Sequence, residues 1–159
     1  MAFFSAGDTD LGRVLVWQVR LDRPPEEAAF LRSLLSPEEM RRAEAFRFES
    51  AREHFAVARG ALRAILADRL SISPQSLSFL HGSHGKPYLA GGPGFNLSHC
   101  EDLALIAVAE DDRPVGVDVE RVRPIQELPS IEERYFHAEE RGFLAAASPG
   151  ERPRAFLTL

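Results

Sequence analysis

The chain is poor in cysteine, because Cys100 is its only thiol in 159 residues. A single cysteine excludes an intrachain disulfide and fits a reducing, cytoplasmic setting. The five histidines show no zinc-ligand spacing with Cys100, so no zinc site is predicted. Stability must therefore come from a hydrophobic core, and a hydrophobic content of 45% is enough to build one in a chain of this length.

A net positive charge and long apolar runs are also lacking. The formal net charge of -5 argues against nonspecific nucleic-acid binding, which needs a basic surface that displaces counterions from phosphates. An anionic ligand would have to meet a local basic cluster instead. The longest clean apolar run, Leu103 to Ala109, is far shorter than the roughly 20 residues that span a bilayer. The first residues lack the features of a signal peptide, so a soluble protein without a membrane partner is expected.

Helix signals follow an early strand. Residues 14–19 form a short apolar run that predicts a buried strand. Ser36-Pro37-Glu38-Glu39 then combines an N-cap, a proline suited to the first helical turn and a capping-box glutamate, which predicts a helix start. Ser50 and Glu53 repeat the capping-box spacing before an apolar stripe, so a long amphipathic helix should run to about Leu70.

Further strands are predicted beyond a loop rich in glycine. Residues 81–94 contain five of the eleven glycines and are expected to be a loop, which is a suitable place for a binding site. The pattern then favours strands at residues 95–98, 103–109 and 115–120. We interpret the last two as a hairpin joined by the polar turn at residues 110–114.

Asp118 and Glu120 alternate with valines in Val115-Gly116-Val117-Asp118-Val119-Glu120. Because a strand sends alternate residues to opposite faces, both carboxylates are expected on one face, with Cα atoms roughly 6.5 to 7 Å apart. Two such oxygen ligands suit Mg²⁺, which fills its remaining positions with water and substrate phosphate oxygens. Two solvated side chains on an exposed hairpin would show the same pattern, so the spacing leaves both interpretations open.

Polar side chains flank the loop and the strand after it. Lys86 and Pro87 follow Gly85 in a geometry suited to holding a phosphate, although an ordinary turn with an exposed lysine has the same composition. Ser98 and His99 suit hydrogen bonds to a ligand phosphate, and a purely structural histidine is the alternative. A Ser-His nucleophilic pair is not expected, because adjacent strand residues point to opposite faces.

A basic stretch surrounds the two helix starts. It contains Arg41, Arg42, Arg47, Arg52 and Arg59. Acidic residues lie among these arginines, so the stretch has two possible explanations. It could be a solvated, salt-bridged helix face, or a few of its arginines could bind the 3′-phosphate of a nucleotide.

Three of these motifs stand in a particular order. Gly85-Lys86-Pro87-Tyr88 is followed by Phe95-Asn96-Leu97-Ser98-His99-Cys100 and then by the stretch from Val115 to Glu120. Upstream lies the basic helical region at residues 35–55. This series resembles the motif series of the Sfp-type 4′-phosphopantetheinyl transferase superfamily, over nearly the whole chain.

The resemblance implies an α+β fold of the 4′-phosphopantetheinyl transferase type, with two pseudo-symmetric lobes and coenzyme A in the cleft between them. Residues 1–100 would form the N-terminal lobe, which carries the residues that bind coenzyme A phosphates. Residues 101–159 would begin a C-terminal lobe that includes the Mg²⁺-binding hairpin and is incomplete here. A cleft formed within one two-lobed chain would suit a monomer.

The implied activity is the Mg²⁺-dependent transfer of 4′-phosphopantetheine from coenzyme A to a serine of an acyl or peptidyl carrier protein, with release of adenosine 3′,5′-bisphosphate. Such carriers serve fatty-acid, polyketide or nonribosomal-peptide biosynthesis. By this resemblance, Asp118 and Glu120 are the metal ligands and the catalytic carboxylates. The resemblance assigns substrate binding to Lys86, Pro87, Ser98, His99, Arg42 and Arg52.

The family has a Trp-x-x-Lys-Glu motif soon after a helix like residues 155–159, and this sequence does not contain it. The glutamate and lysine of that motif would add metal and phosphate contacts. A truncated chain with weak or no activity is therefore expected. The alternative is a noncatalytic remnant that binds coenzyme A or a carrier protein, and a simple Mg²⁺-phosphate binding module is a third interpretation.

Overall fold

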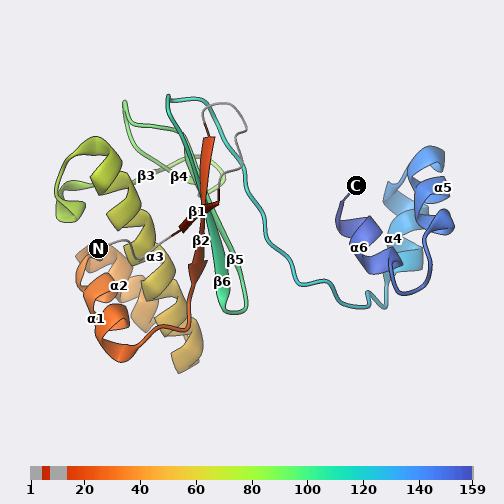
Figure 1. Ribbon diagram of the computed structural model, residues 1–159, viewed down its shortest axis with the longest axis horizontal. Coiled ribbons are helices and arrows are strands. Elements are labelled where there is room, and N and C mark those ends of the chain that lie inside the picture. The colour runs from red at the N-terminus through yellow and green to blue at the C-terminus, as the bar shows by residue number, and fades with distance from the viewer. Residues whose placement is uncertain (1–4, 8–13, 159) are drawn as a thin grey trace. The chain divides into compact units, whose positions relative to one another are not determined.

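The computed structural model describes residues 5–7 and 14–158. The chain forms two compact units, which divide between Val119 and Glu120. The first unit holds the sheets and the three helices α1 to α3, and the second holds α4 to α6 (Figure 1). Both helices and antiparallel strands are present, which confirms the α+β class.

An antiparallel sheet with the strand order β1-β2-β6-β5 forms the centre of the first unit. Its strands are β1 (Ser5–Gly7), β2 (Val14–Arg20), β5 (Phe95–Cys100) and β6 (Leu103–Ala109). Strand β6 pairs with β2 on one side and with β5 on the other. The residues of β6 from Leu103 to Ala109 are all apolar, and each is buried or half-buried in this central strand.

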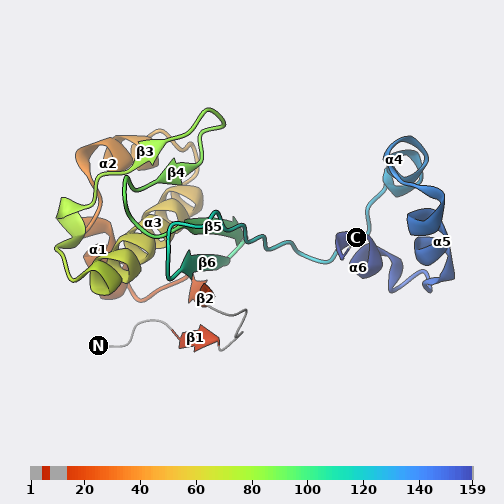
Figure 2. The same cartoon turned by 90° about the horizontal axis from the view of Figure 1, so that it is seen from above.

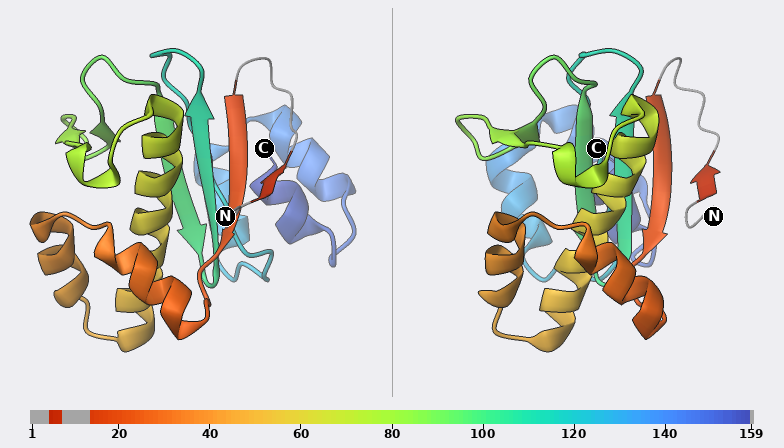
Figure 3. Two further views of the ribbon diagram at one scale, coloured as in Figure 1. Left: turned by 60° about the vertical axis from the view of Figure 1, so that its left-hand side comes forward. Right: turned by 90° about the vertical axis from the view of Figure 1, so that its left-hand side faces the viewer.

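Three helices lie on one face of this sheet (Figures 2 and 3). They are α1 (Pro25–Ser33), α2 (Pro37–Glu44) and α3 (Glu49–Leu70). The core between helices and sheet contains Leu62 and Leu66 of α3, Leu31 of α1 and Ile106 of β6, each 1% exposed or less. A short helix, η1 (Pro74–Ser76), and a two-stranded hairpin of β3 (Leu80–His81) and β4 (Pro87–Tyr88) follow α3.

The two helix starts predicted by capping boxes have different outcomes. At α2 the box is confirmed, because Ser36 Oγ accepts from the Glu39 amide at 3.2 Å and Glu39 Oε2 accepts from the Ser36 amide at 2.8 Å. The box predicted for Ser50 and Glu53 is wrong. Helix α3 begins at Glu49, so Ser50 already lies inside the helix and cannot occupy the extended N-cap position, which Phe48 takes.

The hairpin predicted between residues 103–109 and 115–120 is also wrong. Both edges of β6 are already occupied, and its hairpin partner is β5, joined by a tight turn in which Glu101 has a φ of 52°. Residues 115–120 belong to no strand or helix. The lobe boundary expected after residue 100 lies inside this β5-β6 turn, whereas the compact units divide after Val119. The two-lobed arrangement stays a prediction.

The second unit contains α4 (Leu128–Tyr135), α5 (Ala138–Ala146) and α6 (Arg152–Leu157). Glu132 of α4 is buried and pairs with Arg152 of α6 at 2.6 Å. The rings of Phe136 and Phe156 stack with centroids 5.5 Å apart. No helix within residues 14–158 is both long enough and apolar enough to cross a membrane.

Gly60 lets α3 approach α1 closely. A Cβ atom at this position would lie 2.2 Å from the carbonyl oxygen of Leu31, which is backbone and cannot move aside cheaply. We expect Gly60→Ala to lower the free energy of unfolding by about 1 to 3 kcal/mol through overpacking, although alanine is the better helix former. Urea unfolding followed by circular dichroism measures the change.

Gly142→Ala is the matched control for this substitution. Gly142 also lies inside a helix, α5, but nothing is within 4 Å of a Cβ built there. Its replacement should leave stability unchanged or raise it by up to about 1 kcal/mol. Equal effects of the two substitutions would show that the α1-α3 contact does not require glycine.

Candidate functional site

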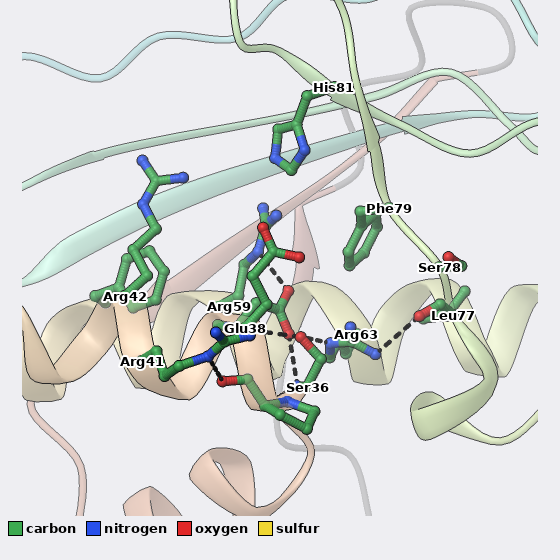
Figure 4. Close-up of a pocket in the computed structure, with 13 residues that line it drawn as sticks. Ser36, Glu38, Arg41, Arg42, Arg59, Arg63, Leu77, Ser78, Phe79 and His81 are labelled. Carbon is green, nitrogen blue, oxygen red and sulfur yellow. Dashed lines mark hydrogen bonds and ion pairs between the residues drawn. The ribbon is translucent and has the colours of Figure 1, made fainter.

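A basic cavity of about 350 Å³ lies where α2, α3 and the β3 segment meet (Figure 4). Arg42 comes from α2, Arg59 from α3 and His81 from β3. Figure 4 shows these three side chains around one opening, together with Phe79. Two guanidinium groups and an imidazole at one opening are suited to an anionic ligand such as a phosphate.

A second cavity, of about 250 Å³, continues from the first towards strand β5. The two cavities share Arg42, Phe55, Arg59 and His81. The second is bordered in addition by Gly85, Pro87, Asn96, Leu97 and His99. The basic residues of the helices and the sequence motifs of the loop and of β5 therefore line one continuous surface.

Glu39 organises the floor of the first cavity. Glu39 is 7% exposed, and its carboxylate accepts from Arg59 Nε at 2.7 Å and from Arg63 Nε at 2.6 Å. Arg63 is 2% exposed and also donates to the Pro74 carbonyl at 2.6 Å. One buried carboxylate thus faces two guanidinium groups, and Glu38 and Arg41 line the same cavity.

The guanidinium group of Arg59 is held on two sides. Its carbon atom lies 4.7 Å from the centroid of the Phe79 ring, and its Nε bonds to Glu39. Burial lowers the pKa of Arg59 most, Glu39 raises it, and the charges of Arg42 and Arg63 lower it further, with a net decrease. The folded protein therefore makes this positive charge costly, and an anion bound beside it would reduce that cost.

The predicted substrate residues divide into two groups. Arg42, Pro87 and His99 line the cavities. Arg52 lines neither cavity and instead donates to Glu49 at 2.9 Å and to the Phe46 carbonyl at 3.3 Å, within the start of α3. The structure therefore brings Arg42 and Arg59 to the cavity, and a contact between Arg52 and coenzyme A stays a prediction.

Lys86 and Ser98 contact the acidic segment, which we define as residues 115–119. Lys86 Nζ donates to the Val115 carbonyl, and Ser98 Oγ donates to Asp118 Oδ1 at 2.6 Å. Ser98 and its neighbour His99 lie at consecutive positions of β5, so their side chains point to opposite faces. His99 accordingly borders the cavity, while Ser98 bonds to Asp118.

The predicted metal ligands lie on exposed backbone. Asp118 and Glu120 are both exposed, and Val117 and Val119 beside Asp118 are half-buried. Their carboxylate oxygens are the donors that Mg²⁺ prefers, so the residue types fit this ion. Within residues 5–7 and 14–158, no cluster of three or more histidine, cysteine or acidic side chains forms a metal site. The division between the units separates Asp118 from Glu120, and their pairing stays a prediction.

Some residues of the site were not predicted as binding residues. They are Glu39, Arg63, His81 and Asn96, whereas Arg59 was identified only as one of five arginines in the basic stretch. Glu39 was identified as a capping residue, and only its second, buried role was missed. Arg59 and Arg63 lie four residues apart, on one face of α3. Two arginines within one turn of a largely apolar helix face indicate that an acidic partner lies near them.

Known proteins resemble this chain in sequence. The family model described as 4′-phosphopantetheinyl transferase, N-terminal, matches residues 22–111. The 4′-phosphopantetheinyl transferase HetI of Nostoc sp. is 36% identical over 148 residues, which are 90% of this chain and 62% of that protein. The 4′-phosphopantetheinyl transferase psf-1 of Bacillus pumilus is 34% identical over 128 residues, covering 79% of this chain and 53% of that protein.

A more distant relative matches almost the same extent. The 4′-phosphopantetheinyl transferase Sfp of Bacillus subtilis is 25% identical over 148 residues, or 91% of this chain and 64% of that protein. The chain thus spans less than two thirds of the length of each of these three relatives. The matched region includes the cavity residues from Arg42 to His99.

Proposed function

Because the chain belongs to the 4′-phosphopantetheinyl transferase family, we propose that it moves the 4′-phosphopantetheine arm of coenzyme A to a serine of an acyl or peptidyl carrier protein. The observation that carries this proposal is the continuous basic surface formed by Arg42, Arg59 and His81 beside strand β5. It offers positive charge to the phosphates of coenzyme A. The same strand holds the acidic segment through Ser98.

In this proposal Arg42 and Arg59 bind a phosphate of coenzyme A, and Pro87 and His99 border the nucleotide. Lys86 and Ser98 remain proposed contacts to coenzyme A that also hold the acidic segment. Asp118 and Glu120 would hold Mg²⁺, and this ion would orient the pyrophosphate and stabilise charge on the transferring phosphoryl group. The carrier serine attacks the β-phosphate, and adenosine 3′,5′-bisphosphate leaves.

We also propose a monomer in the cytoplasm. A binding cleft formed within one two-lobed chain would suit a monomer. The single cysteine agrees with a reducing compartment. Sedimentation velocity at micromolar concentration tests the monomer.

We expect apo carrier protein to gain the mass of one phosphopantetheine when it is incubated with this chain, coenzyme A and Mg²⁺. Asp118→Asn should reduce the rate at least tenfold, because removal of one charged group that positions the metal costs at least about 1.4 kcal/mol of transition-state stabilisation. Intact-mass spectrometry of the carrier measures both. Removal of Mg²⁺ with a chelator should stop the reaction.

Asp112→Asn is the matched control, since Asp112 is an exposed carboxylate in the neighbouring turn. Its rate should equal that of the unsubstituted chain. If no carrier protein gains mass while coenzyme A still binds, the chain is a binding protein and the proposed transfer is wrong. Equal rates for Asp118→Asn and the unsubstituted chain would remove Asp118 from the site.

A further inference from the structure

Asn96 contacts the acidic segment through the backbone of that segment. The Val117 amide donates to Asn96 Oδ1 at 2.9 Å, and the Val119 amide donates to Ser98 Oγ at 3.3 Å. Asn96 and Ser98 are two residues apart on β5, and the two amides are two residues apart on the segment. Each of these two β5 side-chain oxygens therefore accepts from one backbone amide of the segment, at the spacing of an extended chain. The segment itself is not a strand of the sheet.

The start of the segment is fixed by different contacts. The Gly94 amide donates to the Asp111 carbonyl at 2.8 Å, and a Cβ at Gly94 would lie 1.7 Å from the Arg113 carbonyl oxygen. Lys86 then bonds to the Val115 carbonyl. From Val117 onwards the hydrogen bonds to the segment come from the side chains of Asn96 and Ser98. The anchors thus follow the segment up to Asp118.

We propose that Asn96 is a positioning residue, whose side-chain oxygen fixes the backbone on the N-terminal side of Asp118 and so presents the Asp118 carboxylate to its ligand. The identity of the ligand in this inference rests on the proposed function, whereas the contact between Asn96 and Val117 does not. Asn96 lies on the sheet face opposite the α3 core, at a position where its neighbours Phe95 and Leu97 pack inward. An amide there is not needed to fill the core, and its role is the bond to Val117.

The chemistry of the contact fixes which variants are informative. The Val117 amide is a donor, so only the oxygen of the Asn96 side chain can accept from it. Asn96→Asp retains an oxygen acceptor of the same length, whereas Asn96→Ala removes it. Gln18→Ala is the matched control. Gln18 is an exposed amide on the same sheet face, since Gln18 and Ser98 both pair with Leu105, and no bond between it and the segment is found among the described residues.

Amide hydrogen exchange measured by NMR on the chain tests the contact without any ligand. In Asn96→Ala the Val117 amide should exchange about fivefold faster, which corresponds to the loss of one ordinary hydrogen bond. Asn96→Asp and Gln18→Ala should match the unsubstituted chain. Unchanged exchange at Val117 in Asn96→Ala, or equally fast exchange in Asn96→Asp, would overturn the proposal.

The transfer assay supplies the second measurement. Asn96→Ala should lower kcat by a larger factor than it raises KM for coenzyme A, and Asn96→Asp should restore kcat, because a displaced Asp118 impairs the reaction more than it impairs binding. A fall in the melting temperature as large as that of Gly60→Ala would instead assign Asn96 a merely structural role. If the unsubstituted chain transfers nothing, the proposed function fails, and the exchange at Val117 still decides the role of Asn96.

Discussion

Glu39→Ala is expected to lower the free energy of unfolding by about 3 to 5 kcal/mol, because it removes the carboxylate shared by the buried guanidinium group of Arg63 and the half-buried one of Arg59. Glu39 bonds to Arg59 at 2.7 Å and to Arg63 at 2.6 Å. Arg63 is 2% exposed, so it cannot recover its hydration when the carboxylate is lost. The capping bond to the Ser36 amide would disappear as well. Urea unfolding followed by the fluorescence of Trp17, the single tryptophan, measures the loss.

The neighbouring Glu38 provides the control. It is exposed, and Glu38→Ala should change stability by less than about 0.5 kcal/mol. Glu39→Gln keeps the shape and an acceptor oxygen, so its loss of unfolding free energy should lie between those of Glu39→Ala and Glu38→Ala. If Glu39→Ala were no more destabilising than Glu38→Ala, the buried network would not contribute to the stability of the first unit.

The pH dependence of this loss has a defined sign. Burial by itself raises the pKa of Glu39, but the Ser36 amide, Arg63 and Arg59 together lower it below its ordinary value of 4.5. Near that pH the unfolded chain binds more protons at Glu39 than the folded protein does. The contribution is therefore complete above about pH 4.5 and is lost as the pH falls below it. Glu39→Gln should lack this part of the acid sensitivity.

The elements that could be predicted are those whose local signals agree with their surroundings. The apolar run at residues 103–109 and the capping box at Ser36 both identify their elements correctly. The hairpin failed because periodicity locates strands but does not select their partners. Residues 115–119 alternate like a strand, and yet side chains of β5, in place of a neighbouring backbone, accept from the amides of Val117 and Val119.

The candidate site shows the same limit. The motif order pointed to Lys86, Ser98 and Asp118, and the structure brings the three together through the acidic segment. The arginine that accompanies Arg42 could not be selected from the basic stretch, because charge pattern alone does not distinguish an exposed helix face from a cavity wall. The distinction arises from tertiary contacts, namely the Glu39 carboxylate and the Phe79 ring beside Arg59.

Arg59→Ala should weaken the binding of coenzyme A by about 10- to 100-fold, since a hydrogen bond to a charged group contributes about 1.5 to 3 kcal/mol. Arg59 is pre-oriented by Glu39 and Phe79, so little side-chain entropy is lost when a phosphate binds. Arg59→Lys keeps the charge but not the planar group and should recover only part of the affinity. Isothermal titration with coenzyme A measures the dissociation constants, and circular dichroism checks that each variant is folded.

Arg47→Ala is the control from the same basic stretch. Arg47 is exposed over the Phe48 ring and lines neither cavity, so its removal should leave the affinity within about twofold. Titration with dephospho-coenzyme A, which lacks the 3′-phosphate, identifies the group that Arg59 binds. If that group is the 3′-phosphate, Arg59→Ala loses most of its effect with this ligand, because the partner is already gone. If Arg59→Ala weakens the binding of dephospho-coenzyme A as much as that of coenzyme A, Arg59 binds the pyrophosphate instead. If it weakens the binding of neither ligand, the cavity is excluded as the coenzyme A site.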